Sequence, residues 1–449
     1  MSTDPRITLA REPMSGAQVA AVVICILLTA LDGFDVLSIS FAAPGIAAEW
    51  GIDRGALGIV LSMELIGMAV GSVIIGGLAD RIGRRPAILG CLTVMALGMY
   101  LASTAPDITI LSAFRFATGL GIGGMLASTN AMAAEFSNAK RRNLSVILMA
   151  AGYPVGVIVG GSIASILLVY FDWRSVFLFG TAATTVFVPL TWYFLPESIE
   201  HLIHRRPHGA LARVNATLQR MGHATIDALP PAEKNAAPSS MRALFSPALA
   251  HTTILLTIAY FTHIMTFYFT LKWIPKIIVD MGFAPALAGG VLVWANVGGV
   301  TGSVLLGLLA QRYAVRRLVI ATLILGAGAV IWFGQGQADL AELSLVAAAV
   351  GFFTNAAVVG LYALFAQSFP TALRAGGTGF VIGFGRGGSA TGPIIAGFLF
   401  AAGASLPSVA LVMALGSVIA AASLAFLRTR HAQPASMRGH AARPTTIER

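Results

Sequence analysis

Residues 19–43 read VAAVVICILLTALDGFDVLSISFAA, an apolar run long enough to cross a lipid bilayer as a helix. Its only charged side chains are Asp32 and Asp35, which share one helix face because they are three residues apart. A carboxylate near the bilayer centre costs at least about 2.5 kcal/mol, so it usually faces a cavity or a partner. Two interpretations remain open. The two acids are either a structural pair held by a neighbouring arginine or a proton or substrate site, since a carboxylate removed from water can bind a proton near neutral pH.

The composition places the chain among helical membrane proteins. Of its 449 residues, 57% are hydrophobic and only 11% are charged, which is far from the composition of an ordinary soluble domain. Residues 1–18 are polar and the first apolar run is too long for a signal peptide, so we expect no cleavable leader. Cys25 and Cys91 both fall inside predicted spans, so we expect free thiols. We find no phosphate loop, metal-ligand cluster or catalytic constellation, and we therefore expect no cofactor, no metal and no enzyme activity.

Apolar runs predict an all-α membrane protein with twelve transmembrane helices. The predicted spans are residues 19–43, 55–79, 86–104, 108–134, 143–170, 174–194, 250–275, 286–310, 317–335, 342–366, 375–402 and 405–427. The predicted organisation is a tail (1–18), a first six-helix bundle (19–195), a central loop (196–249), a second six-helix bundle (250–428) and a disordered tail (429–449). Within the central loop, residues 210–221 predict a short amphipathic helix.

The basic residues predict the orientation. If the N-terminus is cytoplasmic, 23 of the 29 Lys and Arg residues lie in cytoplasmic segments, three lie outside and three lie within spans. This bias predicts that both termini are cytoplasmic. The net charge of +10 is then a consequence of topology or contacts anionic lipid, and we expect no nucleic-acid partner.

The two halves resemble each other. Residues 76–85 read GGLADRIGRR after the second span, and residues 307–317 read GLLAQRYAVRR after the eighth, 231 positions later. This repeat predicts two pseudo-symmetric bundles. In the fourth span, Gly119, Gly123, Ala127 and Ala131 recur at every fourth position, which predicts close packing against a neighbouring helix.

The segment GGLADRIGRR is similar to the signature G-x-x-x-D-R-x-G-R-R of the major facilitator superfamily, and Glu135 and Arg142 have that family's E-x6-R spacing. The resemblance implies a conformational gate at the cytoplasmic side. Its predicted residues are Gly76, Asp80, Arg81, Gly83, Arg84, Arg85, Glu135, Arg142 and Arg374. Asp80 could cap a helix N-terminus or pair with Arg84 or Arg142.

Within that superfamily, the motif DGFD at residues 32–35 resembles the D-G-x-D of the aromatic acid:proton symporters. Further matches in order are Arg115, Glu135, Arg374 and Arg386. The resemblance implies proton-coupled import of benzoate-like acids across the bacterial inner membrane, and we expect a monomer in the lipid bilayer.

The predicted substrate site combines charges at similar depth in the membrane. Asp32 and Asp35 would carry the proton, and Arg386 and Arg115 would bind the carboxylate, because a guanidinium suits a planar bidentate ligand. The other predicted site residues are Phe34, Glu64 and His263. A hydrogen-bonded core histidine remains an alternative for His263, and Lys272 is expected to extend its ammonium group to the membrane surface.

Two other functions remain open. One is proton-coupled transport of another organic anion, such as a dicarboxylate or an aliphatic acid. The other is a membrane sensor for aromatic acids, which would bind its ligand without accumulating it.

Overall fold

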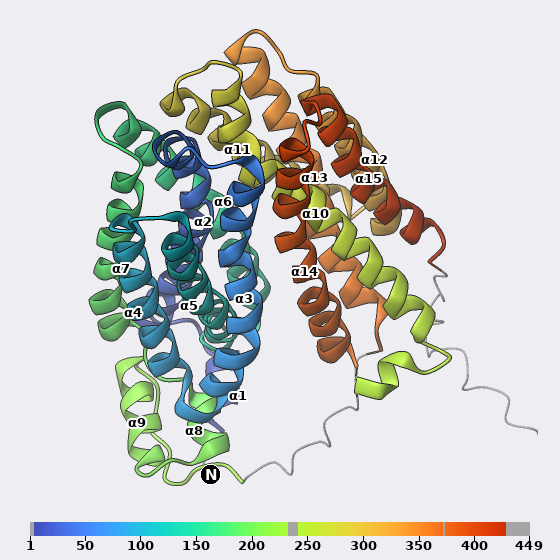
Figure 1. Cartoon of the computed structure of the whole chain (residues 1–449). Helices are drawn as coiled ribbons and strands as arrows, with labels where there is room; N and C mark the ends of the chain where they lie inside the picture. Colours follow the sequence, from blue (N-terminus) through green and yellow to red (C-terminus); the bar gives the residue numbers. More distant parts are fainter. Residues whose placement is uncertain (1–3, 232–240, 371–372, 428–449) are drawn as a thin grey trace, which may run out of the picture.

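The computed structural model describes residues 4–231, 241–370 and 373–427, and its regular structure there is helical (Figure 1). Twelve long helices in these ranges form an N-terminal bundle and a C-terminal bundle. The first bundle contains α2 Gly16–Trp50, α3 Arg54–Ile82, α4 Arg84–Ser103, α5 Ile108–Glu135, α6 Arg142–Tyr170 and α7 Arg174–Phe194. The second contains α10 Ala250–Asp280, α11 Pro285–Leu309, α12 Val315–Gly334, α13 Leu340–Ser368, α14 Arg374–Ala401 and α15 Leu406–Ala425.

Short polar residues begin several of the long helices. Ser15 and Gln18 form a capping box at the start of α2, in which each side chain accepts a hydrogen bond from the other residue's backbone N–H. Asp53 starts α3, where its carboxylate accepts a hydrogen bond from the Ala56 N–H. Gly51 ends α2 in the left-handed region at φ 58°, a conformation that glycine adopts without steric cost. A link of only three residues therefore turns the chain from α2 into the antiparallel α3.

The helix contacts repeat between the bundles. The pairs α3–α5, α2–α6 and α4–α7 of the first bundle correspond to α11–α13, α10–α14 and α12–α15 of the second. The contacts between bundles are also paired, since α3 packs on α14 and α6 packs on α11, while α2 faces α10. The predicted fold, two pseudo-symmetric bundles of six helices, is therefore confirmed.

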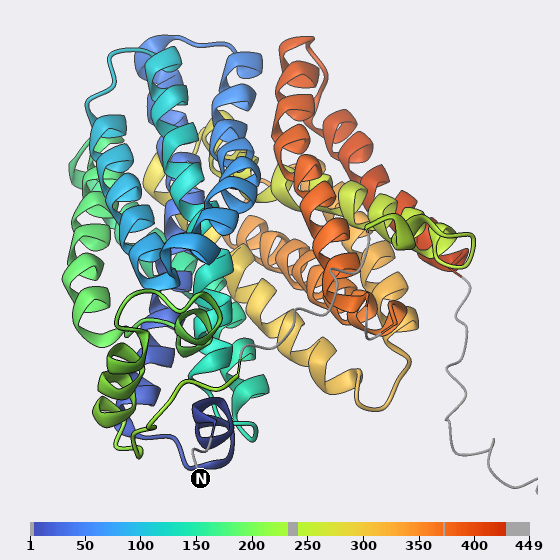
Figure 2. The same cartoon turned by 90° about the horizontal axis from the view of Figure 1, so that it is seen from below.

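The bundles meet at one end of the molecule, which we call the contact end; it comprises the C-termini of α2, α10 and α14 and the N-termini of α3 and α11. There Ser62 Oγ donates a hydrogen bond to the Ala390 carbonyl at 2.7 Å. Arg54 Nη2 lies 3.0 Å from Asp280 Oδ2. Below these contacts the helices of the two bundles diverge (Figures 1 and 2). The charge pattern predicts the contact end to face outward and the opposite end to face the cytoplasm.

Eleven of the long helices in the described ranges are apolar enough along 18 residues to cross a membrane, and α14 is not among them. Arg374, Arg386 and a series of glycines make α14 less apolar than its neighbours. It nevertheless packs against α3 of the first bundle and α10 of the second. The chain is thus a multi-pass membrane protein in which α14 contacts both bundles.

Two segments predicted as a tail and a loop contain helices. Residues 1–18 include α1 (Pro5–Arg11), and the central segment includes α8 (Ile199–Arg205), α9 (Ala210–Arg220) and the 3-10 helix η1 (Met241–Phe245). The helix α9 confirms the amphipathic helix predicted at residues 210–221. His223 Nδ1 lies 2.7 Å from Glu12 Oε2, so the N-terminal segment contacts the central one. The predicted disordered tail at 429–449 lies outside the described residues.

Candidate functional site

Six ionisable side chains gather where α2 and α3 face the C-terminal bundle. They are Asp32, Asp35, Glu64, Arg115, Lys272 and Arg386. The first five are at most 2% exposed, and Arg386 is half-buried. The sequence predicted five of these residues as site residues, and the structure brings those five together. We call the six residues the charge cluster.

Two of the three guanidinium nitrogens of Arg115 have partners on the N-terminal side of the cluster, whereas Nε has none among the described residues. Its Nη2 lies 2.5 Å from Glu64 Oε2 and donates a hydrogen bond to the Asp35 carbonyl at 2.8 Å. Its Nη1 lies 2.9 Å from Met99 Sδ, and its guanidinium lies 5.4 Å from the centroid of the Phe177 ring. This arginine therefore joins α5 to α2 and α3, and its charge is balanced by Glu64.

Lys272 does not extend to the membrane surface, so that prediction is wrong. Its side chain is completely buried, it donates a hydrogen bond to the Val36 carbonyl, and its Nζ lies 3.5 Å from Glu64 Oε2. The orientation of α10 turns Lys272 inward, on the same face as Tyr268 one turn earlier. The i, i+4 spacing of Tyr268 and Lys272 was the one signal in the sequence that could have identified this residue.

Asp32 and Arg386 have buried polar atoms without partners among the described residues. Both carboxylate oxygens of Asp32 lack a hydrogen bond, as does Nη1 of Arg386. Asp35 Oδ1 is also unbonded, while Asp35 Oδ2 lies 3.5 Å from Thr184 Oγ1. Arg115 Nε and both Glu64 carboxylate oxygens also lack a hydrogen bond, although Glu64 Oε2 takes part in ion pairs. Since buried polar groups are nearly always hydrogen-bonded, the unpartnered atoms of the cluster are where a ligand or a proton could bind.

Glycines let the helices that carry the cluster approach closely. A Cβ on Gly33 would overlap the Tyr153 carbonyl of α6, and a Cβ on Gly119 would overlap the Glu64 carbonyl of α3. A Cβ on Gly123 would likewise overlap the Met68 carbonyl. The predicted close packing of the fourth span is confirmed at Gly119 and Gly123, and it places Glu64 beside Arg115.

Four tyrosines from both bundles lie near the cluster. They are Tyr153, Tyr260, Tyr268 and Tyr362. Tyr260 Oη and Tyr362 Oη are 3.0 Å apart, and Tyr260 and Tyr268 lie within electrostatic range of Arg386. The side chains of Tyr260 and Tyr268 therefore lie near the guanidinium. Nothing in the sequence distinguished these tyrosines from the many other aromatic residues in the spans.

The side chains of two predicted site residues point into their own bundles. Phe34 packs inside the N-terminal bundle, where its ring makes an edge contact with Phe179 at 5.1 Å between centroids. His263 is buried in the C-terminal bundle, with Nδ1 2.9 Å from Ser417 Oγ and Nε2 2.9 Å from the Thr354 carbonyl. Both nitrogens of His263 are thus occupied, which matches the alternative of a hydrogen-bonded core histidine.

The predicted gate forms a second polar network, at the end opposite the contact end. Glu197 Oε1 accepts hydrogen bonds from the Arg84 and Arg85 N–H groups at 2.9 and 3.2 Å, so this residue caps α4. Arg84 pairs with Glu135, and Ser198 Oγ donates a hydrogen bond to Glu135 Oε2 at 2.6 Å. The network ties α4 and α5 to the start of α8, entirely on the N-terminal side of the molecule.

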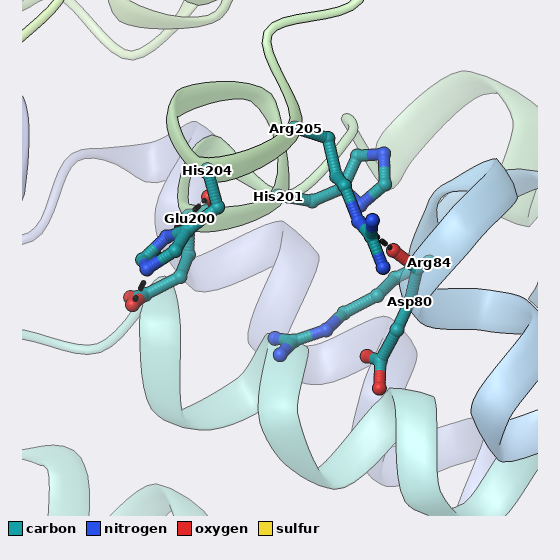
Figure 3. Close-up of a pocket in the computed structure, with 6 residues that line it drawn as sticks. All are labelled: Asp80, Arg84, Glu200, His201, His204 and Arg205. Carbon is teal, nitrogen blue, oxygen red and sulfur yellow. Dashed lines mark hydrogen bonds and ion pairs between the residues drawn. The ribbon is translucent and has the colours of Figure 1, made fainter. Parts of the chain in front are cut away.

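Asp80 lies beside this network in a pocket of about 410 Å³ (Figure 3). The pocket is lined by Asp80, Arg84, Glu200, His201, His204 and Arg205. Partial burial lowers the pKa of His201, so its ring is mostly neutral at pH 7. Asp80 forms no ion pair with Arg84 or Arg142 among the described residues, although it lies within electrostatic range of Arg84. Arg84 pairs with Glu135 instead, and Arg142 Nε donates to the Ala134 carbonyl. The cap predicted from Asp80 is instead supplied by Glu197.

The remaining gate residues lie around the same end. Gly83 joins α3 to α4 at φ 108°, and a Cβ there would crowd the Glu197 carboxylate. Gly76 is half-buried in α3, and Arg81 and Arg374 are exposed at helix ends. Among the described residues, no group of three or more His, Cys, Asp or Glu side chains could hold a metal ion.

The Major Facilitator Superfamily model matches residues 25–300 and 256–447. A gallate transporter from Pseudomonas putida is 29% identical over 426 residues, covering 94% of each chain. A 4-hydroxybenzoate transporter from Acinetobacter baylyi is 31% identical over 412 residues, covering 89% of this chain and 88% of the relative.

A solved structure of the xylose transporter of Escherichia coli, in an inward-open conformation, has the same fold. The TM-score is 0.67 at 16% identity, with 92% of this chain and 98% of that chain covered. The family match extends over nearly the whole chain and includes both bundles. The chain therefore belongs to the major facilitator superfamily, and it is a membrane transport protein rather than an enzyme.

Proposed function

We propose that this transporter imports an aromatic monocarboxylate together with protons across the bacterial inner membrane, by alternating access and with both termini in the cytoplasm. The observation that carries the proposal is the pair of unpartnered groups in the charge cluster. Arg386 Nη1, from the C-terminal bundle, and the Asp32 carboxylate, from the N-terminal bundle, are buried without hydrogen bonds among the described residues. An arginine can bind a carboxylate, and a free buried aspartate can bind a proton.

The charge balance of the cluster supports coupling to protons. Three acids and three bases are present, and their charges cancel when all six are ionised. A bound monocarboxylate adds one negative charge, and one proton on an aspartate restores neutrality. Because uncompensated charge is costly in a buried site, substrate and proton favour each other's binding at this cluster.

The surrounding tyrosines support an aromatic substrate. Tyr260 and Tyr268 lie near Arg386, where their rings could pack on an aromatic ligand and their hydroxyl groups could bond to ring substituents. The gallate and 4-hydroxybenzoate transporters that resemble this chain are named for aromatic acids. Arg115 already pairs with Glu64, so in this proposal it positions Asp35 while Arg386 binds the substrate.

The arrangement of the bundles supports alternating access. In the orientation that the basic residues predict, the contact end faces outward and is closed by α3–α14 and α6–α11 packing. The predicted gate has no ion pair with the C-terminal bundle among the described residues. This arrangement corresponds to a carrier that is closed to the outside and releases substrate to the cytoplasm.

Uptake into proteoliposomes tests the proposal. The purified protein should accumulate labelled 4-hydroxybenzoate when the interior is made alkaline, and excess unlabelled benzoate should compete better than succinate or hexanoate. Protein-free liposomes correct for passive entry of the protonated acid. Accumulation that succinate or hexanoate blocks more strongly than benzoate would favour another organic anion. Binding without any accumulation would favour a sensor.

A further inference from the structure

Lys272 is a cation of the C-terminal bundle that is bonded to the N-terminal bundle. Its side chain is 0% exposed, it donates a hydrogen bond to the Val36 carbonyl of α2, and its Nζ lies 3.5 Å from Glu64 Oε2 of α3. A buried ammonium group is costly unless it is paired and hydrogen-bonded. Both contacts require α10 to lie against α2 and α3, so they depend on how closely the bundles approach.

Lys272 also completes the charge balance of the cluster. Glu64 is shared by two cations, Arg115 on its own bundle at 2.5 Å and Lys272 on the other bundle at 3.5 Å. Without Lys272, three acids would face two bases in a largely buried site. If the bundles separated at the contact end, water could solvate the uncompensated charge.

We propose that Lys272 is a positioning residue of the transport cycle. It holds the contact end closed by joining α10 to Glu64 and Val36, and it must leave both partners when that end opens. The link to transport rests on the proposed function above, whereas the effect on the contact end requires no substrate.

The chain offers a matched control for this proposal. Arg54 and Asp280 form a second ion pair between the bundles at the contact end, with side chains 45% and 28% exposed. Water and salt screen such a pair, and exposed ion pairs contribute little. Replacing Arg54 should therefore affect the closed state much less than replacing Lys272, although each substitution removes one cation from one cross-bundle ion pair.

Distances between spin labels test the proposal without substrate. Labels at Thr104→Cys and Ala402→Cys report on the contact end, and labels at Lys140→Cys and Tyr313→Cys report on the opposite end, because all four positions are exposed. Cys25 and Cys91 are first replaced by alanine. In Lys272→Met, the fraction of molecules with a long distance at the contact end should rise at least about fivefold, and the distance at the opposite end should shorten. In Arg54→Gln, the distance distributions at both ends should match those of the unsubstituted protein.

The double variant Glu64→Gln/Lys272→Met separates charge from packing. It removes one acid and one base, so the buried charges balance again and the closed fraction should return towards that of the unsubstituted protein. Lys272→Gln serves as a second single variant if Lys272→Met does not fold. A contact end that stays closed in the single variant, or that opens equally in the single and double variants, overturns the proposal. If the distances change as expected but uptake of aromatic acids fails, the role of Lys272 stands and the proposed function falls.

Discussion

Arg115 Nη2 lies 2.5 Å from Glu64 Oε2, and both side chains are completely inaccessible to water. This ion pair changes how the predicted substrate site is interpreted. Because both Nη atoms of Arg115 already have partners and only its Nε has none, the arginine better placed to bind a carboxylate with two nitrogens is Arg386, whose Nη1 is unpartnered among the described residues.

Arg386 should recognise the carboxylate of the substrate. Arg386→Ala should weaken binding by about 2–5 kcal/mol, as when one member of a buried ion pair is removed. Arg386→Lys should also bind weakly, because the planar fork that matches a carboxylate is lost. Equilibrium binding of 4-hydroxybenzoate and of its amide to purified protein measures this effect. The amide should bind the unsubstituted protein poorly and distinguish little between variants, whereas equal losses for acid and amide would make Arg386 a structural residue.

Asp32 and Asp35 should couple uptake to protons. Asp32→Asn and Asp35→Asn should each abolish accumulation driven by a pH gradient, while exchange of labelled for unlabelled substrate should survive better because exchange need not release the proton. Asp172→Asn, at an exposed carboxylate, serves as the control. Full gradient-driven accumulation by the Asp32→Asn/Asp35→Asn double variant would exclude these two acids from coupling.

Asp80 should act on the rate of cycling and not on substrate binding. Its carboxylate has no ion pair among the described residues in this arrangement of the bundles, so we expect its partner to become available when the opposite end closes. Asp80→Asn should lower the maximum uptake rate at least about fivefold while the equilibrium dissociation constant stays unchanged. Gln311→Ala, at the corresponding position of the second half, should have little effect. A weaker affinity at an unchanged maximum rate would contradict the assignment.

Gly123 should be required for the packing of α5 on α3. In Gly123→Ala the added methyl group would overlap the Met68 carbonyl, and such overpacking costs about 1–3 kcal/mol. In Gly90→Ala nothing lies within 4 Å of the new methyl group, so the higher helix propensity of alanine should leave stability equal or higher. Thermal unfolding in detergent compares the two variants. Equal Tm values for both would show that the close approach of α5 and α3 tolerates a side chain.

The large-scale architecture was accessible from the sequence because it depends on local patterns. Apolar runs, the basic residues between them and the repeated motif near Asp80 require no knowledge of how each helix is rotated. The rotation of each helix about its own axis decides which side chains face the site. Lys272 was expected at the membrane surface because its position along α10 allows that, but the side chain points towards Glu64. Phe34 and His263 lie at suitable depths yet point into their own bundles.

The predicted gate shows a second limit of prediction from sequence, because the residues that bond to one another there are far apart in the chain. The motif identified Arg84 and Glu135, but the cap on α4 comes from Glu197, more than 110 residues later. A carboxylate that follows a spanning helix can serve many purposes, and only the folded chain brings it to the N-terminus of α4. Pairings of this kind cannot be derived from spacing.

Simultaneous measurement of substrate and proton entry shows whether the two cross the membrane together. Proteoliposomes that contain an internal pH indicator receive labelled 4-hydroxybenzoate without an imposed gradient, and protein-free liposomes and the Asp32→Asn/Asp35→Asn variant are measured in parallel. We expect proteoliposomes with the transporter to show more substrate entry and more internal acidification than either control. The ratio of protons to substrate molecules that enter through the transporter should be constant. Protein-dependent entry of substrate without acidification would contradict it.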